Sequence, residues 1–242
     1  MTFAKEITNI IKEYNWGTYI ETGLASGASA EKALNLNFKK VVSIEINKDF
    51  VSKAKIKFHN YIKNERLVLL EGDSSVLLDY AMRKYTDVSV IFLDAHDGDH
   101  ENNAPLEREL EIIKKYFNNQ LIIIDDFLKI KYNYKFKDPK YWVKKNSHKE
   151  ILKKLREISN DMDEFFWGKY GSYTSALINK KIHRPIINLK EIEIKLYFFL
   201  YPFGLSLKKV FLKFLKLIIG NKNYSIIQKK FNNILFNLRK TN

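Results

Sequence analysis

Over the first 180 residues the sequence alternates between short apolar runs of strand length and longer segments of helical periodicity. The strand-like runs are residues 18–21, 40–46, 67–71, 88–94, 121–126, 165–167 and 173–178. The predicted helices are residues 3–14, 28–36, 48–61, 74–83, 106–116 and 149–158. Runs that are almost wholly apolar, such as 88–94, are typical of strands covered on both faces. The pattern predicts an α/β fold with a doubly wound, mostly parallel, seven-stranded Rossmann-like sheet that ends in an antiparallel pair.

Positive charge is concentrated toward the C-terminus. The formal net charge over 242 residues is +14, and residues 186–242 contribute +9 of it, with 11 Lys or Arg and 2 Asp or Glu. Residues 1–185 are therefore only mildly basic, so the charge alone does not indicate a nucleic-acid-binding protein. We predict a main domain at 1–185 and a basic, amphipathic helical extension at 186–242.

Within this extension, residues 205–219 place lysines on one arc of a predicted helix and apolar residues over the rest. The segment is too short and too charged to span a bilayer. Three interpretations stay open: peripheral contact with an anionic membrane, packing on the main domain, and packing in a homodimer. The chain has no cysteine and no signal-peptide pattern, so we expect a cytoplasmic location, with a peripheral position at the inner membrane surface as the alternative.

An E-x-G-x-x-x-G pattern lies where the first strand gives way to the next helix. Glu21, Gly23 and Gly27 form the pattern, and Ser29 stands at the start of the helix. Glycine allows a tight turn and a close approach of backbone to ligand, and a helix start offers unpaired N–H groups. We therefore predict that these four residues bind a nucleoside-containing cofactor.

Acidic residues follow the next two strands. Glu45 lies 18 positions after Gly27, which suits a carboxylate that accepts both ribose hydroxyls, and its alternative is a surface pair with Lys48. Asp73, followed by Ser74, either accepts from an adenine amino group or caps the next helix. The closely spaced glycines that admit a pyrophosphate are missing, so a ligand without phosphates fits better.

Three further aspartates follow the fourth and fifth strands. Asp94 ends one apolar run, and Asp125 and Asp126 end the other. Carboxylates at neighbouring strand ends raise one another's pKa unless a cation neutralises them, and oxygen ligands suit Mg²⁺ or Ca²⁺. The alternative is that one aspartate caps a helix and another faces nearby lysines.

Candidate bases follow Asp94 directly. His96 is two residues further on, where a neutral imidazole is suited to removing a proton from a substrate hydroxyl. The alternatives are a structural histidine, or Asp97 or Asp99 as the base. We predict His96 and Asp94 as the catalytic pair.

These motifs resemble those of class I S-adenosylmethionine-dependent methyltransferases over roughly residues 15–180. The matching pieces are Glu-Thr-Gly-Leu-Ala-Ser-Gly, Ser-Ile-Glu45, Glu-Gly-Asp73, Phe-Leu-Asp94-Ala-His96 and Ile-Ile-Asp125-Asp126. Within that superfamily the combination is similar to the macrocin O-methyltransferase type. The resemblance implies S-adenosylmethionine as the methyl donor and Mg²⁺ held by Asp94, Asp125 and Asp126.

The acceptor is predicted from the segment 129–149, which interleaves lysines with aromatic residues and which we expect to form a long loop or lid. Aromatic rings stack on sugars or bases, and lysines meet phosphate. With the resemblance, this favours a hydroxyl of a sugar-containing small molecule or nucleotide-linked sugar, in glycan or natural-product biosynthesis. The alternatives for the protein are a nucleic-acid-binding RNA methyltransferase and a non-catalytic membrane-associated scaffold. The alternative for the segment 129–149 is a solvated loop without a role in binding.

Overall fold

The computed structural model describes residues 5–14, 17–36, 38–95, 105–125, 147–169, 172–179 and 181. The chain divides into two compact units, Met1–Pro185 and Ile186–Asn242, and every described residue belongs to the first. The predicted extension at 186–242 and most of the predicted lid therefore lie outside the described residues.

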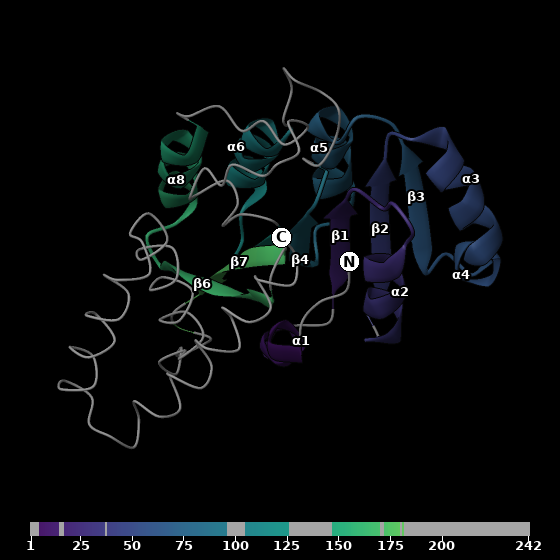
Figure 1. The fold of residues 1–242 in the computed structure, drawn as a ribbon, viewed down its shortest axis with the longest axis horizontal. Coiled ribbons are helices and arrows are strands. Elements are labelled where there is room, and N and C mark those ends of the chain that lie inside the picture. The colour runs from purple at the N-terminus through teal and green to yellow at the C-terminus, as the bar shows by residue number, and fades with distance from the viewer. Residues whose placement is uncertain are drawn as a thin grey trace, which may run out of the picture. The chain divides into compact units, whose positions relative to one another are not determined.

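A seven-stranded sheet forms the centre of the first unit, with the strand order β3-β2-β1-β4-β5-β7-β6 (Figure 1). Its strands are β1 (Thr18–Thr22), β2 (Lys40–Glu45), β3 (Leu67–Glu71), β4 (Val88–Leu93), β5 (Leu121–Ile124), β6 (Met162–Lys169) and β7 (Ser172–Asn179). The first five pair in parallel, whereas β7 runs antiparallel to both β5 and β6. The predicted doubly wound sheet with a closing antiparallel pair is confirmed.

Helices cover both faces of this sheet. They are α1 (Lys5–Ile11), α2 (Ala28–Asn35), α3 (Lys48–Lys57), α4 (His59–Lys63), α5 (Ser74–Lys84), α6 (Leu106–Tyr116) and α8 (Ser147–Ile158). Apolar residues of α1, α2 and α3 share one core cluster with alternate residues of the strands, among them Tyr19, Val90 and Ile123. On the other face α5 packs beside α6, and α6 beside α8 (Figure 1). Burial from both sides explains the apolar runs: every residue of β4 is buried.

The predicted helix at 48–61 is wrong in one respect, because it is two helices. Phe58 separates α3 from α4 with backbone angles of φ −108° and ψ 20°, and it is only 2% exposed. Its ring lies where a side chain on Gly27 would have to be, with the nearest ring atom 2.6 Å from an added Cβ. Packing of this ring beneath the Gly27 turn is a tertiary contact that helical periodicity does not reveal.

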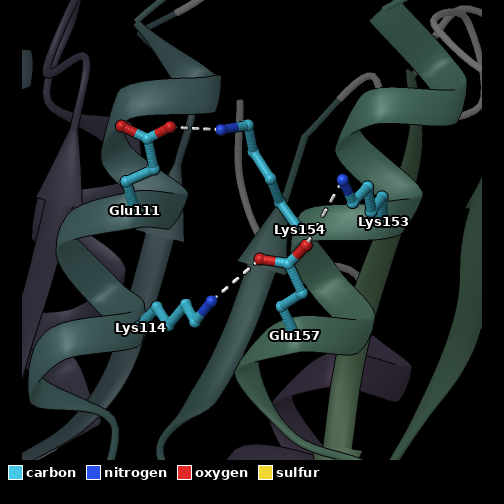
Figure 2. Close-up of polar contacts among 5 residues, drawn as sticks. All are labelled: Glu111, Lys114, Lys153, Lys154 and Glu157. Carbon is cyan, nitrogen blue, oxygen red and sulfur yellow. Dashed lines mark hydrogen bonds and ion pairs between the residues drawn. The ribbon is translucent and has the colours of Figure 1, made fainter.

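Three ion pairs join α6 to α8 or lie along α8 (Figure 2). Lys154 contacts Glu111, and Lys114 lies 2.8 Å from Glu157. Lys153 adds a longer contact of 3.9 Å to Glu157. All five side chains keep some exposure, so solvent screens each pair, and burial of apolar residues such as Leu155 holds the helices together.

Among the described residues, no helix is both long enough and apolar enough to cross a membrane. The amphipathic segment 205–219 is not among them.

Candidate functional site

The carboxyl ends of the parallel strands are linked by backbone hydrogen bonds just beyond the sheet. The N–H of Gly23 donates to the carbonyl of Ile44, and that of Gly72 donates to Glu45, at 2.9 Å each. The N–H of Asp94 donates to the carbonyl of Thr22 at 3.0 Å. The loops after β1, β2, β3 and β4 therefore start from one edge of the sheet, where α/β proteins bind their ligands.

The glycine turn between β1 and α2 requires its glycines. Gly23 and Gly27 have φ of 82° and 75°, in the left-handed region that disfavours other residues. A Cβ on Gly23 would lie 2.5 Å from the backbone oxygen of Asp94. Both the conformation and the close approach of two loops therefore account for the E-x-G-x-x-x-G pattern.

Glu45 lies at the end of β2 beside the glycine turn and is 8% exposed. Its carboxylate accepts hydrogen bonds from the N–H of Ala25 at 2.9 Å and of Asn47 at 2.8 Å, one on each oxygen. The side chain is therefore held against the glycine turn at the end of β2, and each oxygen retains a further lone pair. No ion pair joins Glu45 to Lys48 within the described part of the chain, so the alternative, a surface pair of these two residues, is not formed.

Glu21 occupies a different position from the one predicted. It is completely buried, and the hydroxyls of Ser43 and Tyr19 donate to its two oxygens at 2.7 and 3.2 Å. Burial raises the pKa of Glu21 from 4.5 to about 7, although hydrogen bonds from Ser29, Ser43 and Tyr19 lower it. With no exposed surface in this structure, Glu21 supports the turn from below, and its contact with a cofactor stays a prediction.

Ser29 and Ser74 also face the interior. Each is 4% exposed, and the Ser29 hydroxyl holds Glu21, whereas the Ser74 hydroxyl lies beside Glu109 of α6. Both serines stand in the first turn of a helix that packs on the sheet, and this packing turns their side chains inward. In this structure their hydroxyls support the neighbouring loops, and their role in cofactor contact stays a prediction.

Asp73 combines exposure with a structural role. It caps α5, because its carboxylate accepts from the N–H of Ser75 at 2.8 Å. The capping role is thus one of the two interpretations that the sequence left open for Asp73. The second carboxylate oxygen of Asp73 accepts no hydrogen bond from a described residue. Asp73 follows Gly72, whose backbone is bonded to Glu45, so both acids border the same stretch of the sheet edge.

Asp94 and Asp125 lie at adjacent strand ends, as the metal prediction requires. The N–H of Asp125 donates to the carbonyl of Leu93 at 3.0 Å, directly before Asp94. Asp125 is 2% exposed, and both carboxylates contribute to raising the pKa of Tyr19, after burial and Glu21. No group of three candidate metal ligands occurs in the described ranges, and the third predicted ligand, Asp126, is not in them. The predicted base His96, and with it Asp97 and Asp99, also falls outside them.

Two buried polar residues beside the site were not predicted. Glu109 lies on the apolar stripe of α6 and is completely buried, as is Thr22 at the end of β1. Burial raises the pKa of Glu109 from 4.5 to about 7, with Ser74 and Thr22 lowering it and the charge of Asp73 raising it. The sequence did contain a signal, because Glu109 has the same helical phase as the buried residues Leu106, Leu110 and Ile113 of α6.

An exposed apolar residue also stands at this edge. Ile46, directly after Glu45, is 58% exposed. An isolated exposed apolar side chain is common on protein surfaces, but this one directly follows the carboxylate that borders the glycine turn.

No protein-family model and no curated protein matches the chain. Solved structures do share its fold. An O-methyltransferase from Bacillus cereus in complex with SAH is 13% identical, with a TM-score of 0.50, and the match covers 73% of this chain and 82% of that one. The methyltransferase domain of bacterial CtHen1-C is 13% identical, with a TM-score of 0.51 and coverage of 72% and 94%. With its strand order and its glycine turn, this chain has the fold of the class I S-adenosylmethionine-dependent methyltransferases.

Proposed function

We propose that this protein is an S-adenosylmethionine-dependent O-methyltransferase. One observation carries the proposal: a left-handed glycine turn at the end of β1 is bonded through Ala25 to the carboxylate of Glu45 at the end of β2. The turn admits a ligand close to the backbone, and the carboxylate beside it is already oriented. Cofactors that contain a nucleoside use both features at this edge of a doubly wound sheet.

The side chains at this edge suit an adenosyl group. Glu45 has lone pairs left for two ribose hydroxyls, and Ile46 offers an apolar surface to a flat ring. Asp73, one strand further along, has a carboxylate oxygen available for an amino group. None of the three is a phosphate-binding side chain, which fits a donor without phosphates.

Methyl transfer makes modest demands on the protein. The donor, when bound, supplies an electrophilic methyl group, so catalysis depends mainly on alignment of the acceptor oxygen in a site that excludes water. Asp94 and Asp125 offer carboxylate oxygens at adjacent strand ends, and this donor chemistry fits a hard cation such as Mg²⁺ with Asp126 as the third ligand. His96 is the proposed acceptor of the hydroxyl proton.

The proposed acceptor is a sugar hydroxyl in a small molecule or nucleotide-linked sugar. Its support is the resemblance to the macrocin O-methyltransferase type and the lysines and aromatic residues of 129–149. A methylation assay with radiolabelled donor on nucleotide-linked sugars and on RNA separates the two acceptor classes. Methylation of RNA alone, with binding that weakens steeply as salt is added, would contradict the sugar proposal.

Cofactor binding is tested by calorimetry with S-adenosylmethionine and S-adenosylhomocysteine. We expect both to bind, and Glu45→Ala to weaken binding by about tenfold or more, since charge-assisted hydrogen bonds contribute about 1.5–3 kcal/mol each. Glu71→Ala is the matched control. Glu71 lies opposite Glu45 in the register of β2 and β3. Its side chain, however, is 40% exposed and forms an ion pair with Lys55. Wild-type protein that binds neither compound would remove the enzymatic proposal and favour a non-catalytic protein with the same fold.

A further inference from the structure

The glycine turn between β1 and α2 contains a strained residue that is not glycine. Ala25 has a φ of 44°, between Gly23 at 82° and Gly27 at 75°. An alanine in the left-handed region has a higher energy than in the ordinary helical or extended regions, so its neighbours must hold it there. Ala25 is exposed, and burial of its side chain does not supply this hold.

Two other elements are hydrogen-bonded to the backbone of the turn at neighbouring positions. The N–H of Ala25 donates to the carboxylate of Glu45, at the end of β2, at 2.9 Å. The Nζ of Lys57, in the last turn of α3, donates to the carbonyl of Ser26 at 3.4 Å. The strained residue is thus followed directly by a peptide group that α3 holds in place.

The ammonium group of Lys57 has further contacts that fix its position. It lies 2.8 Å from the carboxylate of Glu31, in the first turn of α2, and 4.8 Å from the centroid of the Phe58 ring, which packs against Gly27. One ammonium group therefore joins the turn to the helices on either side of it. The Lys57 and Glu31 side chains are 42% and 53% exposed, so solvent screens the pair and its contribution to overall stability is small.

We propose that Lys57 is a positioning residue for the proposed cofactor site. By holding the carbonyl of Ser26, it keeps Ala25 in the conformation in which the Ala25 N–H orients Glu45. Glu45 is the proposed ligand of the ribose hydroxyls, so Lys57 acts on cofactor affinity through the turn. This inference rests on the proposed function, because the cofactor is the ligand that reports on it.

The neighbouring lysines of α3 provide a matched comparison. Lys55 forms an ion pair of 3.9 Å with Glu71 of β3, and the ammonium group of Lys53 lies 5.9 Å from the ring centroid of Phe50. Neither contact includes a residue of the turn at 23–27. Loss of Lys55 therefore removes one positive charge and one exposed ion pair from the same helix without releasing the turn.

The test measures affinity for S-adenosylhomocysteine by calorimetry. Lys57→Met keeps most of the apolar stem and removes the ammonium group, and we expect binding about fivefold weaker than that of wild type. Lys57→Arg retains a charged donor for both acceptors, so its affinity should stay within about twofold of wild type, as should that of the control Lys55→Met. The urea midpoint of Lys57→Met should stay close to that of wild type, which shows that weaker binding does not reflect unfolding.

Amide hydrogen exchange followed by NMR tests the turn itself, in the absence of ligand. The Ala25 N–H is bonded to Glu45, and its exchange should be faster in Lys57→Met than in wild type, because the turn opens more often. A lysine that only pairs with Glu31 would leave the exchange of Ala25 unchanged.

The outcomes separate this inference from the proposed function. Equal affinities of Lys57→Met and wild type, or weaker binding with unchanged exchange at Ala25, overturn this inference alone. An equal loss of affinity in Lys55→Met also overturns it, since the loss would then follow from the removed charge and not from the turn. Failure of wild type to bind either S-adenosylmethionine or S-adenosylhomocysteine overturns the proposed function, and this inference with it.

Discussion

Replacement of Glu21 by glutamine should change how the stability of the protein depends on pH. Glu21 is completely buried, and burial raises its pKa from 4.5 to about 7. At pH values between 4.5 and about 7, Glu21 is protonated in the native state and ionised in the unfolded state. The contribution of Glu21 to the free energy of unfolding is therefore fully present below about pH 4.5 and is lost as the pH rises through about 7.

The magnitude follows from the two pKa values. A rise from 4.5 to about 7 corresponds to about 3 kcal/mol. Glutamine does not titrate, so the free energy of unfolding of Glu21→Gln minus that of wild type should increase by about 3 kcal/mol from about pH 4.5 to about pH 8. The sign of the difference at low pH depends on how well Tyr19, Ser29 and Ser43 bond to the amide, but its change with pH does not.

Urea unfolding followed by circular dichroism at several pH values measures this difference. Glu109 titrates in the same range and is present in both proteins, so its contribution cancels. The matched control is Glu31→Gln on α2, where an exposed carboxylate 2.8 Å from Lys57 is replaced, and its profile should run parallel to wild type. A Glu21→Gln profile that is also parallel to wild type would refute the reasoning, because Glu21 would then titrate alike in both states.

Four other outcomes are expected. Gly23→Ala should destabilise the protein by at least about 2 kcal/mol in urea unfolding, because the residue has a φ of 82° and an added Cβ meets a backbone oxygen at 2.5 Å; unchanged stability would contradict the assigned turn. Phe58→Ala should cost about 3–5 kcal/mol in the same assay, since it leaves a cavity beneath Gly27. Lys114→Ala should leave the urea midpoint nearly unchanged, because its pair with Glu157 of α8 is exposed. Asp125→Asn should abolish both methyl transfer and the binding of a divalent cation, which calorimetry with Mn²⁺ measures, while cofactor affinity stays within about twofold of wild type. Full activity of wild type in excess EDTA would disprove the metal's role.

Sequence periodicity located the elements of the sheet closely. The strand at 67–71 and the helix at 106–116 have the predicted bounds, and most other elements differ by one or two residues at an end. These segments were readable because sheet and helix impose different spacings on buried side chains. The break between α3 and α4 at Phe58 could not be predicted from the sequence, because it depends on a contact with a turn about 30 residues earlier in the chain.

Within the candidate site the sequence identified the turn and the acids but not which of them are buried beneath the turn. Glu21 and Glu45 are both acids at strand ends, yet Glu21 is buried beneath the turn and Glu45 borders it. Ser29 and Ser74 likewise turn inward, since the helices they begin pack on the sheet. Glu109 was overlooked because a charged residue in a helix is ordinarily on its exposed side.

The sequence by itself determined the order of the helices and strands and the need for glycine after β1. It also determined that acidic residues lie at the carboxyl ends of the parallel strands, on one edge of the sheet. These follow from local backbone preferences and from the rule that parallel strands end on the same side. The tertiary structure decided which of the polar residues are accessible and which are buried, and therefore which carboxyl groups hold a proton near neutral pH. That depends on the elements packed around each side chain, such as α6 against Thr22 and Ser74, which are distant in the sequence.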